Sequence, residues 1–445
     1  MNKEGGAIRP PSFYICYNLF MREFLKKIVI AVLTSEAKLI LRKYRPKIVA
    51  ITGSVGKTST KDATAKVLEA RFRTRKSEKS YNSEFGVPLT IIGARTGWGS
   101  PLKWLEAIRL GLGAIFTKQN YPEILVLEVG ADRPGDIKKI REWLKPDVAV
   151  VTALAETPVH VEFFESPEEV FEEKAELVKN LPPEASVILN FDDGGVAKMR
   201  DKTSARILTF GLAEGADVKG AAYGIFFQDN APAGIEFEAE SLHVKIPNAL
   251  GEHQALAALA AMTVGKVFDI KSEDAARALS LYSSPPGRLK LIKGIKETLI
   301  LDDTYNSSPK AAQAALETLA ELPAKRKIAV LGDMLELGKH TITAHREIGE
   351  MAAGKKIDLL ITVGVRAKFF TEGALKAGFK KKNVLEFGDS EEAAKKLPEL
   401  IEPGDLILIK GSQGMRMEKI VEALMSEPER APELLCRQDE AWKER

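Results

Sequence analysis

The stretch Ile48-Val49-Ala50-Ile51-Thr52-Gly53-Ser54-Val55-Gly56-Lys57-Thr58-Ser59-Thr60 decides the fold of this chain. It opens with four apolar residues, passes through a loop with two glycines, and ends in a helical pattern. This order predicts a strand, a phosphate-binding loop and a helix. Glycines let successive backbone N–H groups point at one anion, and the helix adds its positive N-terminal end.

The loop is expected to bind the phosphates of a nucleotide. Lys57 would place its charge on the β- and γ-phosphates, and Thr58 would offer its hydroxyl to Mg²⁺. The spacing T-G-x-x-G-K-T differs from the common phosphate-loop pattern because Ile occupies position 51. An ordinary glycine-rich turn is the alternative, but the flanking strand and helix favour the phosphate site. The predicted nucleotide-binding residues of the loop are Gly53, Ser54, Val55, Gly56, Lys57, Thr58 and Ser59.

The fold class follows from strands that alternate with helices along the chain. Apolar runs at 124–130, 147–152 and 186–190 predict further parallel strands, and alternating residues within 205–247 predict appended antiparallel strands. Breaker residues at 283–288 mark a hinge, after which a second α/β pattern begins. We therefore predict an α/β protein with a P-loop-type parallel-sheet domain and a C-terminal Rossmann-like domain. The expected units are a helical leader (1–46), a central domain (47–283), a C-terminal domain (284–428) and a frayed, charged tail (429–445).

Composition narrows the classes of partner. The chain has 445 residues, with 65 basic and 62 acidic side chains, so its charge balance gives no argument for a nucleic-acid partner. Its two cysteines, Cys16 and Cys436, lie near opposite ends, which is typical of a reducing compartment. We expect a cytoplasmic monomer that binds small molecules.

The leader permits two interpretations. Residues 13–41 are rich in apolar side chains, but charges interrupt every run that is long enough to span a bilayer. We favour a helix packed on the next domain. The alternative is a basic amphipathic helix in peripheral contact with the inner membrane face.

Two residues of the central domain point to metal and phosphate chemistry. Glu128 ends an apolar strand, where a carboxylate is placed to hold Mg²⁺; the alternative is a surface acid at a strand end. Lys174 lies in the apolar stripe of a helix that begins with the capping box Ser166-Pro167-Glu168-Glu169. One interpretation is that its side chain extends past its neighbours to solvent. The other is that it turns inward to a charged site or is neutralised by modification. His160, taken alone, is more typical of a loop histidine than of a ligand.

The C-terminal domain supplies further candidates. Arg288 follows the hinge, and Asp302 and Asp303 end the next strand, where carboxylates suit ribose hydroxyls or a metal, or serve a turn. Segments 332–338 and 410–414 each follow a buried strand and form a rim for a second substrate. The predicted substrate-binding residues are Asn82, Tyr305, Asn306, Asp333, Glu336 and Lys410.

Taken in order, these motifs over residues 47–424 resemble the Mur ligases, the ATP-dependent amide-bond ligases of cell-wall synthesis. The segments Asp-Asp-Thr-Tyr-Asn-Ser-Ser-Pro from 302 and Leu-Gly-Asp-Met-Leu-Glu-Leu-Gly from 331 are similar to the MurF branch, which adds D-alanyl-D-alanine to a UDP-N-acetylmuramoyl tripeptide. The resemblance implies ATP and two Mg²⁺ ions, with an acyl-phosphate intermediate in peptidoglycan precursor synthesis. It implies that Thr58 and Glu128 bind one Mg²⁺ and His160 a second, and that Lys174 is carbamylated and bridges to metal. His253, Arg288 and Asp303 would contact the nucleotide.

The chain also departs from the family pattern. Gln254 and Ala257 stand where the family has asparagines, and Gln413 stands where it has arginine. About 46 residues precede the phosphate loop, fewer than a UDP-binding N-terminal domain needs. The acceptor would then be held differently, or be lipid-linked or free of UDP. The alternatives are therefore another Mur-type or folylpolyglutamate-synthase-type ligase, or a non-ligating ATPase scaffold.

Overall fold

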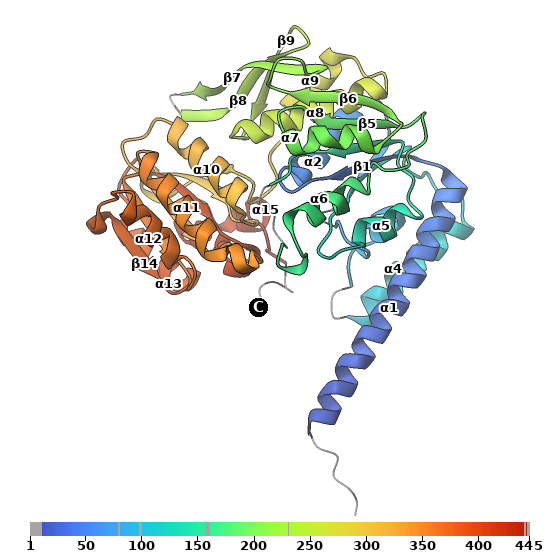
Figure 1. Cartoon of the computed structure of the whole chain (residues 1–445), viewed down its shortest axis with the longest axis horizontal. Helices are drawn as coiled ribbons and strands as arrows, with labels where there is room; N and C mark the ends of the chain where they lie inside the picture. Colours follow the sequence, from blue (N-terminus) through green and yellow to red (C-terminus); the bar gives the residue numbers. More distant parts are fainter. Residues whose placement is uncertain are drawn as a thin grey trace, which may run out of the picture.

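The computed structural model describes residues 11–78, 81–97, 100–155, 161–229, 231–439 and 442, with side chains from residue 25 onward. Figure 1 shows two α/β units side by side, one coloured blue to yellow and the other orange to red. The predicted α/β class is confirmed. The two units are built on separate sheets.

The first unit contains a nine-stranded sheet in the order β2-β3-β1-β4-β5-β6-β7-β8-β9. The central strand β1 (Lys47–Thr52) pairs in parallel with β3 and β4, and the pairing stays parallel as far as β7. Strands β7, β8 and β9 pair antiparallel, as the alternating pattern predicted. The other strands are β2 (Thr74–Lys76), β3 (Ile124–Glu128), β4 (Val148–Val151), β5 (Ser186–Asn190), β6 (Arg206–Gly211), β7 (Val218–Gln228), β8 (Ala231–Ala239) and β9 (Leu242–Pro247).

Helices cover both faces of this sheet, because successive strand residues point to opposite sides. Ala50 of β1 joins one core, whereas Val49 and Ile51 join the other. The first core is closed by α1 (Pro11–Tyr44), α3 (Gly86–Ile92), α4 (Pro101–Phe116), α5 (Asp136–Arg141), α6 (Pro167–Ala175) and α7 (Gly194–Ala197). The second core is closed by α2 (Lys57–Leu68), α8 (Glu252–Val267) and α9 (Ser272–Ser280).

The second unit contains a six-stranded sheet in the order β10-β11-β15-β12-β13-β14, with β10 antiparallel to β11 and the other pairs parallel. Its strands are β10 (Lys290–Lys293), β11 (Leu299–Asp303), β12 (Lys327–Gly332), β13 (Leu359–Val363), β14 (Val384–Phe387) and β15 (Leu406–Lys410). Its helices are α10 (Pro309–Glu321), α11 (Thr341–Gly354), α12 (Lys368–Lys376), α13 (Ser390–Leu400), α14 (Glu418–Leu424) and α15 (Ala431–Leu434).

Strands β10 and β14 have no clear signal in the sequence. Both lie at the edges of the second sheet, where a strand is covered less completely and carries no continuous apolar run. Strand β11 also runs two residues further than its apolar stretch, because β15 pairs with it as far as Asp303 opposite Lys410.

The preferred interpretation of the leader, a helix packed on the next domain, is confirmed for one face of its segment 33–40. Leu33, Ala37 and Ile40 of α1 are fully buried in the first core. Among the described residues, no helix is both long and apolar enough to cross a membrane.

Candidate active site

The phosphate loop has the strand-loop-helix geometry that its sequence predicts. Gly53 and Gly56 have φ angles of 144° and 85°, which favour glycine, and a Cβ on Gly53 would lie 2.0 Å from Thr152 Oγ1. The end of β4 holds the loop: Ser54 N donates to Ala153 O at 2.6 Å, and Thr152 Oγ1 donates to Val55 O at 2.7 Å. The loop is therefore fixed before any ligand binds.

Lys57 is held within its own loop. Its Nζ donates to Gly53 O at 2.9 Å. Burial lowers the pKa of Lys57, while the nearby Glu128 carboxylate opposes that shift. A charged amine in this position is strongly stabilised by a bound anion, because a phosphate would replace the hydration that burial removes.

Lys174 turns inward, which answers the question that its sequence position left open. Ser166 caps α6 by accepting from Glu169 N at 3.3 Å, and Glu169 Oε2 accepts from Glu165 N at 2.7 Å. Lys174 is only 5% exposed and lines the same cavity as Lys57. Burial first and the charge of Lys57 second lower the pKa of Lys174 to about 7. A large share of this amine is therefore neutral near physiological pH.

Glu128 joins the loop to its neighbours. Its Oε2 accepts from Thr58 Oγ1 at 3.0 Å, and its Oε1 accepts from Asn82 Nδ2 at 3.2 Å. Across the residues that the structure describes, no three His, Cys, Asp or Glu side chains form a metal-binding group. The Thr58–Glu128 pair offers two oxygen ligands, which suits Mg²⁺ when substrate phosphates and water supply the others.

The second unit brings its own charges to this site. Lys410 Nζ donates to Asp303 Oδ2 at 2.6 Å and to Asn306 O at 2.9 Å. Arg288 stacks on the Tyr305 ring at 4.2 Å, and its Nη2 reaches Thr58 Oγ1 at 3.4 Å. Arg288 is therefore a direct bridge between the second unit and the phosphate loop.

One cavity of about 630 Å³ lies between the two units. Its lining includes predicted residues from both: Ser54, Val55, Gly56, Lys57, Thr58, Ser59, Asn82, Glu128, Lys174, His253, Arg288, Asp303, Tyr305, Asn306, Glu336 and Lys410. Burial lowers the pKa of His253 to about 4, so its ring is neutral. The structure thus gathers in one place residues that are up to about 350 positions apart in the chain.

Two predicted residues do not line the cavity, and the structure does not describe a third. Gly53 shapes the loop without lining the cavity. Asp333 lies outside the lining, and its Oδ1 accepts from Ala367 N at 2.7 Å. His160 lies outside the described residues, so its metal role stays a prediction.

Sequence reasoning missed two groups that join the units. Lys310 Nζ donates to Leu154 O at 2.7 Å and to Asp193 Oδ2 at 2.8 Å across the gap between them. Gln254, noted only as a departure from the family pattern, is fully buried and donates to Ser284 Oγ and Arg288 O at the hinge. The local sequence does not indicate either pairing, because the partners are 30 or more residues apart in the chain.

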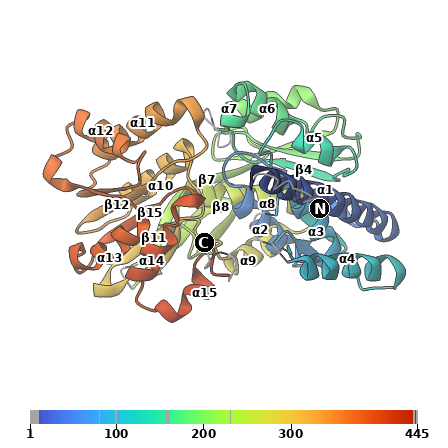
Figure 2. The ribbon, with the colours of Figure 1, turned by 90° about the horizontal axis from the view of Figure 1, so that it is seen from below.

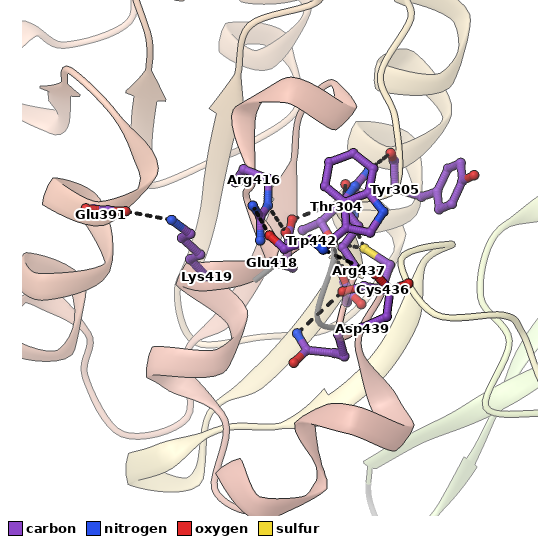
Figure 3. Close-up of polar contacts among 12 residues, drawn as sticks. Thr304, Tyr305, Glu391, Arg416, Glu418, Lys419, Cys436, Arg437, Asp439 and Trp442 are labelled. Atoms are coloured by element: carbon purple, nitrogen blue, oxygen red, sulfur yellow. Dashed lines mark hydrogen bonds and ion pairs between the residues drawn. The ribbon is translucent and has the colours of Figure 1, made fainter. Parts of the chain in front are cut away.

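The expectation of a frayed tail is wrong for the described residues up to 439. Figure 3 shows this segment folded back onto the loop after β11. Arg437 is buried, donates to Thr304 O and Glu418 Oε2 at 3.0 Å each, and also donates to Tyr305 O. The Trp442 side chain lines the cavity. Charged composition suggested solvation, but Arg437 has a buried partner in Glu418 of α14.

Arg437→Ala is expected to raise the KM for ATP about tenfold and to lower the melting temperature. The change removes one of the two arginine partners of the buried Glu418, since Arg416 still pairs with it. It also frees the loop after β11, which carries the Tyr305 ring on which Arg288 stacks. Steady-state kinetics and thermal unfolding measure both effects. Arg430→Ala is the matched control, because Arg430 pairs with Glu427 and Glu433, which are exposed. An unchanged KM would show that the tail does not position the loop.

Two α/β units that close one cavity over a phosphate loop define a nucleotide-dependent enzyme whose site needs both domains. The chain belongs to the Mur ligase family, whose members are ATP-dependent, ADP-forming ligases. Residues 51–265 match the Mur ligase middle domain, and residues 287–413 match the Mur ligase, glutamate ligase domain.

Individual relatives agree with the family models. The UDP-N-acetylmuramoyl-tripeptide–D-alanyl-D-alanine ligase of Bacillus subtilis (strain 168) is 32% identical over 395 residues, covering 88% of this chain and 79% of the relative. The solved MurF ligase from Thermotoga maritima in complex with ADP has a TM-score of 0.73 and 28% identity, covering 90% of this chain and 84% of that one. MurF from Acinetobacter baumannii gives a TM-score of 0.74 at 25% identity, covering 88% and 79%. The predicted resemblance is confirmed.

Proposed function

We propose that this enzyme joins D-alanyl-D-alanine to a UDP-N-acetylmuramoyl tripeptide in peptidoglycan precursor synthesis. The observation that carries the proposal is the shared cavity, where Lys57 and Lys174 of one unit face Arg288, Asp303 and Lys410 of the other. The names of the Bacillus and Thermotoga relatives support the choice of this reaction.

The proposed chemistry has two steps. A carboxylate oxygen of the tripeptide bonds to the γ-phosphorus of ATP, the bond to the bridging oxygen breaks, and ADP leaves. The amine nitrogen of D-alanyl-D-alanine then bonds to the acyl carbon, loses its proton, and displaces phosphate. Lys57 and Arg288 are placed to stabilise negative charge on the transferring phosphoryl group.

We propose that Thr58 and Glu128 hold Mg²⁺ at this site. Their oxygens lie 3.0 Å apart at the mouth of the phosphate loop and are ligand types that Mg²⁺ prefers. The metal would neutralise phosphate charge when bound. A second Mg²⁺, held by His160 and a carbamylated Lys174, is part of the same proposal.

Mass spectrometry tests the reaction. The full chain is incubated with ATP, Mg²⁺, UDP-N-acetylmuramoyl tripeptide and D-alanyl-D-alanine, and we expect the pentapeptide product together with ADP and phosphate. No product with this acceptor, but ligation of another acceptor, would favour a different Mur-type or folylpolyglutamate-synthase-type ligase. Phosphate release that needs no amine would favour the non-ligating ATPase.

We also propose that the enzyme acts as a cytoplasmic monomer. The two units of one chain supply the residues on both sides of the cavity. The use of ATP supports the cytoplasmic location. Peripheral membrane contact through residues 13–41 stays a prediction.

A further inference from the structure

Helix α4 exposes an apolar face. Leu102 and Phe116 are 78% and 81% exposed, and Leu105 and Leu112 are exposed between them. At 100° per residue these four side chains fall within about 80° of one another around the helix. The opposite face, with Ala107, Gly111 and Ala114, is buried against the first unit. A soluble helix normally shows mainly polar residues on its outer face, so this cluster of exposed large apolar side chains is unusual.

Helix α1 lies against α4 and adds to this surface. Lys43 Nζ donates to Ala114 O and Thr117 O, and Tyr44 Oη donates to Ala114 O at 2.9 Å. Gly111 of α4 lets the two helices approach each other closely, since a Cβ there would lie 2.2 Å from Glu36 Oε2 of α1. The exposed apolar side chains of α1 are Leu25, Ile28 and Leu39.

Exposed apolar side chains are concentrated on helices α1 and α4. Of the fifteen large apolar side chains exposed in the described part of the chain, eight belong to α1 and α4. Figures 1 and 2 show α4 and the C-terminal part of α1 on the side of the first unit that faces away from the second unit. None of the side chains described for these helices, from residue 25 onward, lines the cavity between the units.

Basic side chains surround the apolar ones. Residues 25–44 and 101–118 contain eight lysines and arginines but only two glutamates, one of them the buried Glu36. The whole chain is nearly balanced at +3. The exposed basic residues of this surface are Lys26, Lys27, Lys38, Arg42, Lys43, Lys103, Arg109 and Lys118.

We propose that the surface formed by α1 and α4 docks on an anionic phospholipid bilayer. Leucine and phenylalanine side chains would enter the headgroup–acyl boundary, and the basic side chains would pair with lipid phosphates. A second copy of the chain fits less well, because a two-fold interface would bring the basic edges of both copies together. The helices would lie on the membrane without crossing it, and the inference does not depend on the proposed substrates.

Vesicle co-sedimentation of the full chain tests the proposal. With vesicles of phosphatidylcholine and phosphatidylglycerol at 3:1, we expect at least tenfold more bound protein than with phosphatidylcholine alone, and less binding as salt rises. The double variant L102E/F116E should lose at least tenfold of this binding, because both apolar side chains leave the lipid phase. K103E/R109E should lose the preference for anionic vesicles.

The chain offers a matched control. Leu281 and Val365 are 70% and 78% exposed but lie on other parts of the molecule, so L281E/V365E should keep vesicle binding within twofold. Ligase activity without vesicles should be unchanged in the α4 variants, which shows that they fold. Three outcomes would overturn the proposal: no binding to anionic vesicles, equal binding by L102E/F116E, or concentration-dependent dimers that this variant abolishes in the absence of vesicle binding.

Discussion

Lys57→Ala is expected to lower kcat for ligation by about 100- to 1,000-fold, the cost of removing one preorganised charge that stabilises a transition state. The amine lies at the N-terminus of α2, within a loop whose glycines and Thr152 contacts fix its shape. It donates to Gly53 O at 2.9 Å, a bond that a phosphate oxygen would replace. Because burial already lowers its pKa, the charged amine is stabilised by an incoming anion more than an exposed lysine would be.

Lys66→Ala serves as the control for Lys57→Ala, since Lys66 lies in the last turn of the same helix and outside the cavity lining. Both variants are assayed by product formation, and thermal unfolding with and without ATP separates lost binding from lost folding. We expect ATP to raise the melting temperature of Lys66→Ala but much less that of Lys57→Ala. A loss below tenfold in Lys57→Ala, or an equal loss in Lys66→Ala, would contradict the assigned role.

The parts of the site that sequence predicted are those encoded locally. The phosphate loop, the Ser166 cap and the place of Lys174 in the apolar stripe of its helix each depend on residues within about ten positions, where spacing and helical periodicity determine the geometry. That stripe alone left the direction of the Lys174 side chain open. Glu128 was predicted because parallel strands bring their carboxyl ends to one edge. The position of Asp333 after a strand led us to predict a role at the same site. Asp333 does not line the cavity, and its carboxylate accepts from Ala367 N.

The parts that sequence did not predict depend on pairs that are distant in the chain. Lys410 meets Asp303 only because β15 lies beside β11, and Lys310 meets Asp193 only because the two units touch. Arg437 is buried because Glu418 neutralises it, although the composition of the tail indicated a solvated segment. The exposed apolar face of α4 was also not predicted, because an apolar helix next to buried strands is more often buried than exposed.

Lys174→Ala is expected to reduce ligation to a level comparable with Lys57→Ala, because the resemblance assigns to Lys174 a carbamate that bridges to metal. The carbamate forms when a neutral amine adds CO₂ and releases a proton. The pKa of about 7 makes this reaction feasible near neutrality, since about half of the amine is then neutral. Activity of the wild type should fall when CO₂ is removed and return with bicarbonate. Lys174→Ala should not respond.

The direction of the pH dependence separates the carbamate from an unmodified ammonium group at position 174. As pH rises through about 7, the neutral amine and hence the carbamate increase, so activity that needs the carbamate should rise. An ammonium that acts directly would lose its proton over the same range, and activity would fall. A ¹³C NMR signal from labelled bicarbonate, present in the wild type and in Lys179→Ala but absent in Lys174→Ala, would place the adduct. Lys179 is a suitable control because its amine pairs with Glu172 and Glu176. Falling activity without a labelled adduct would assign Lys174 to phosphate binding as a cation.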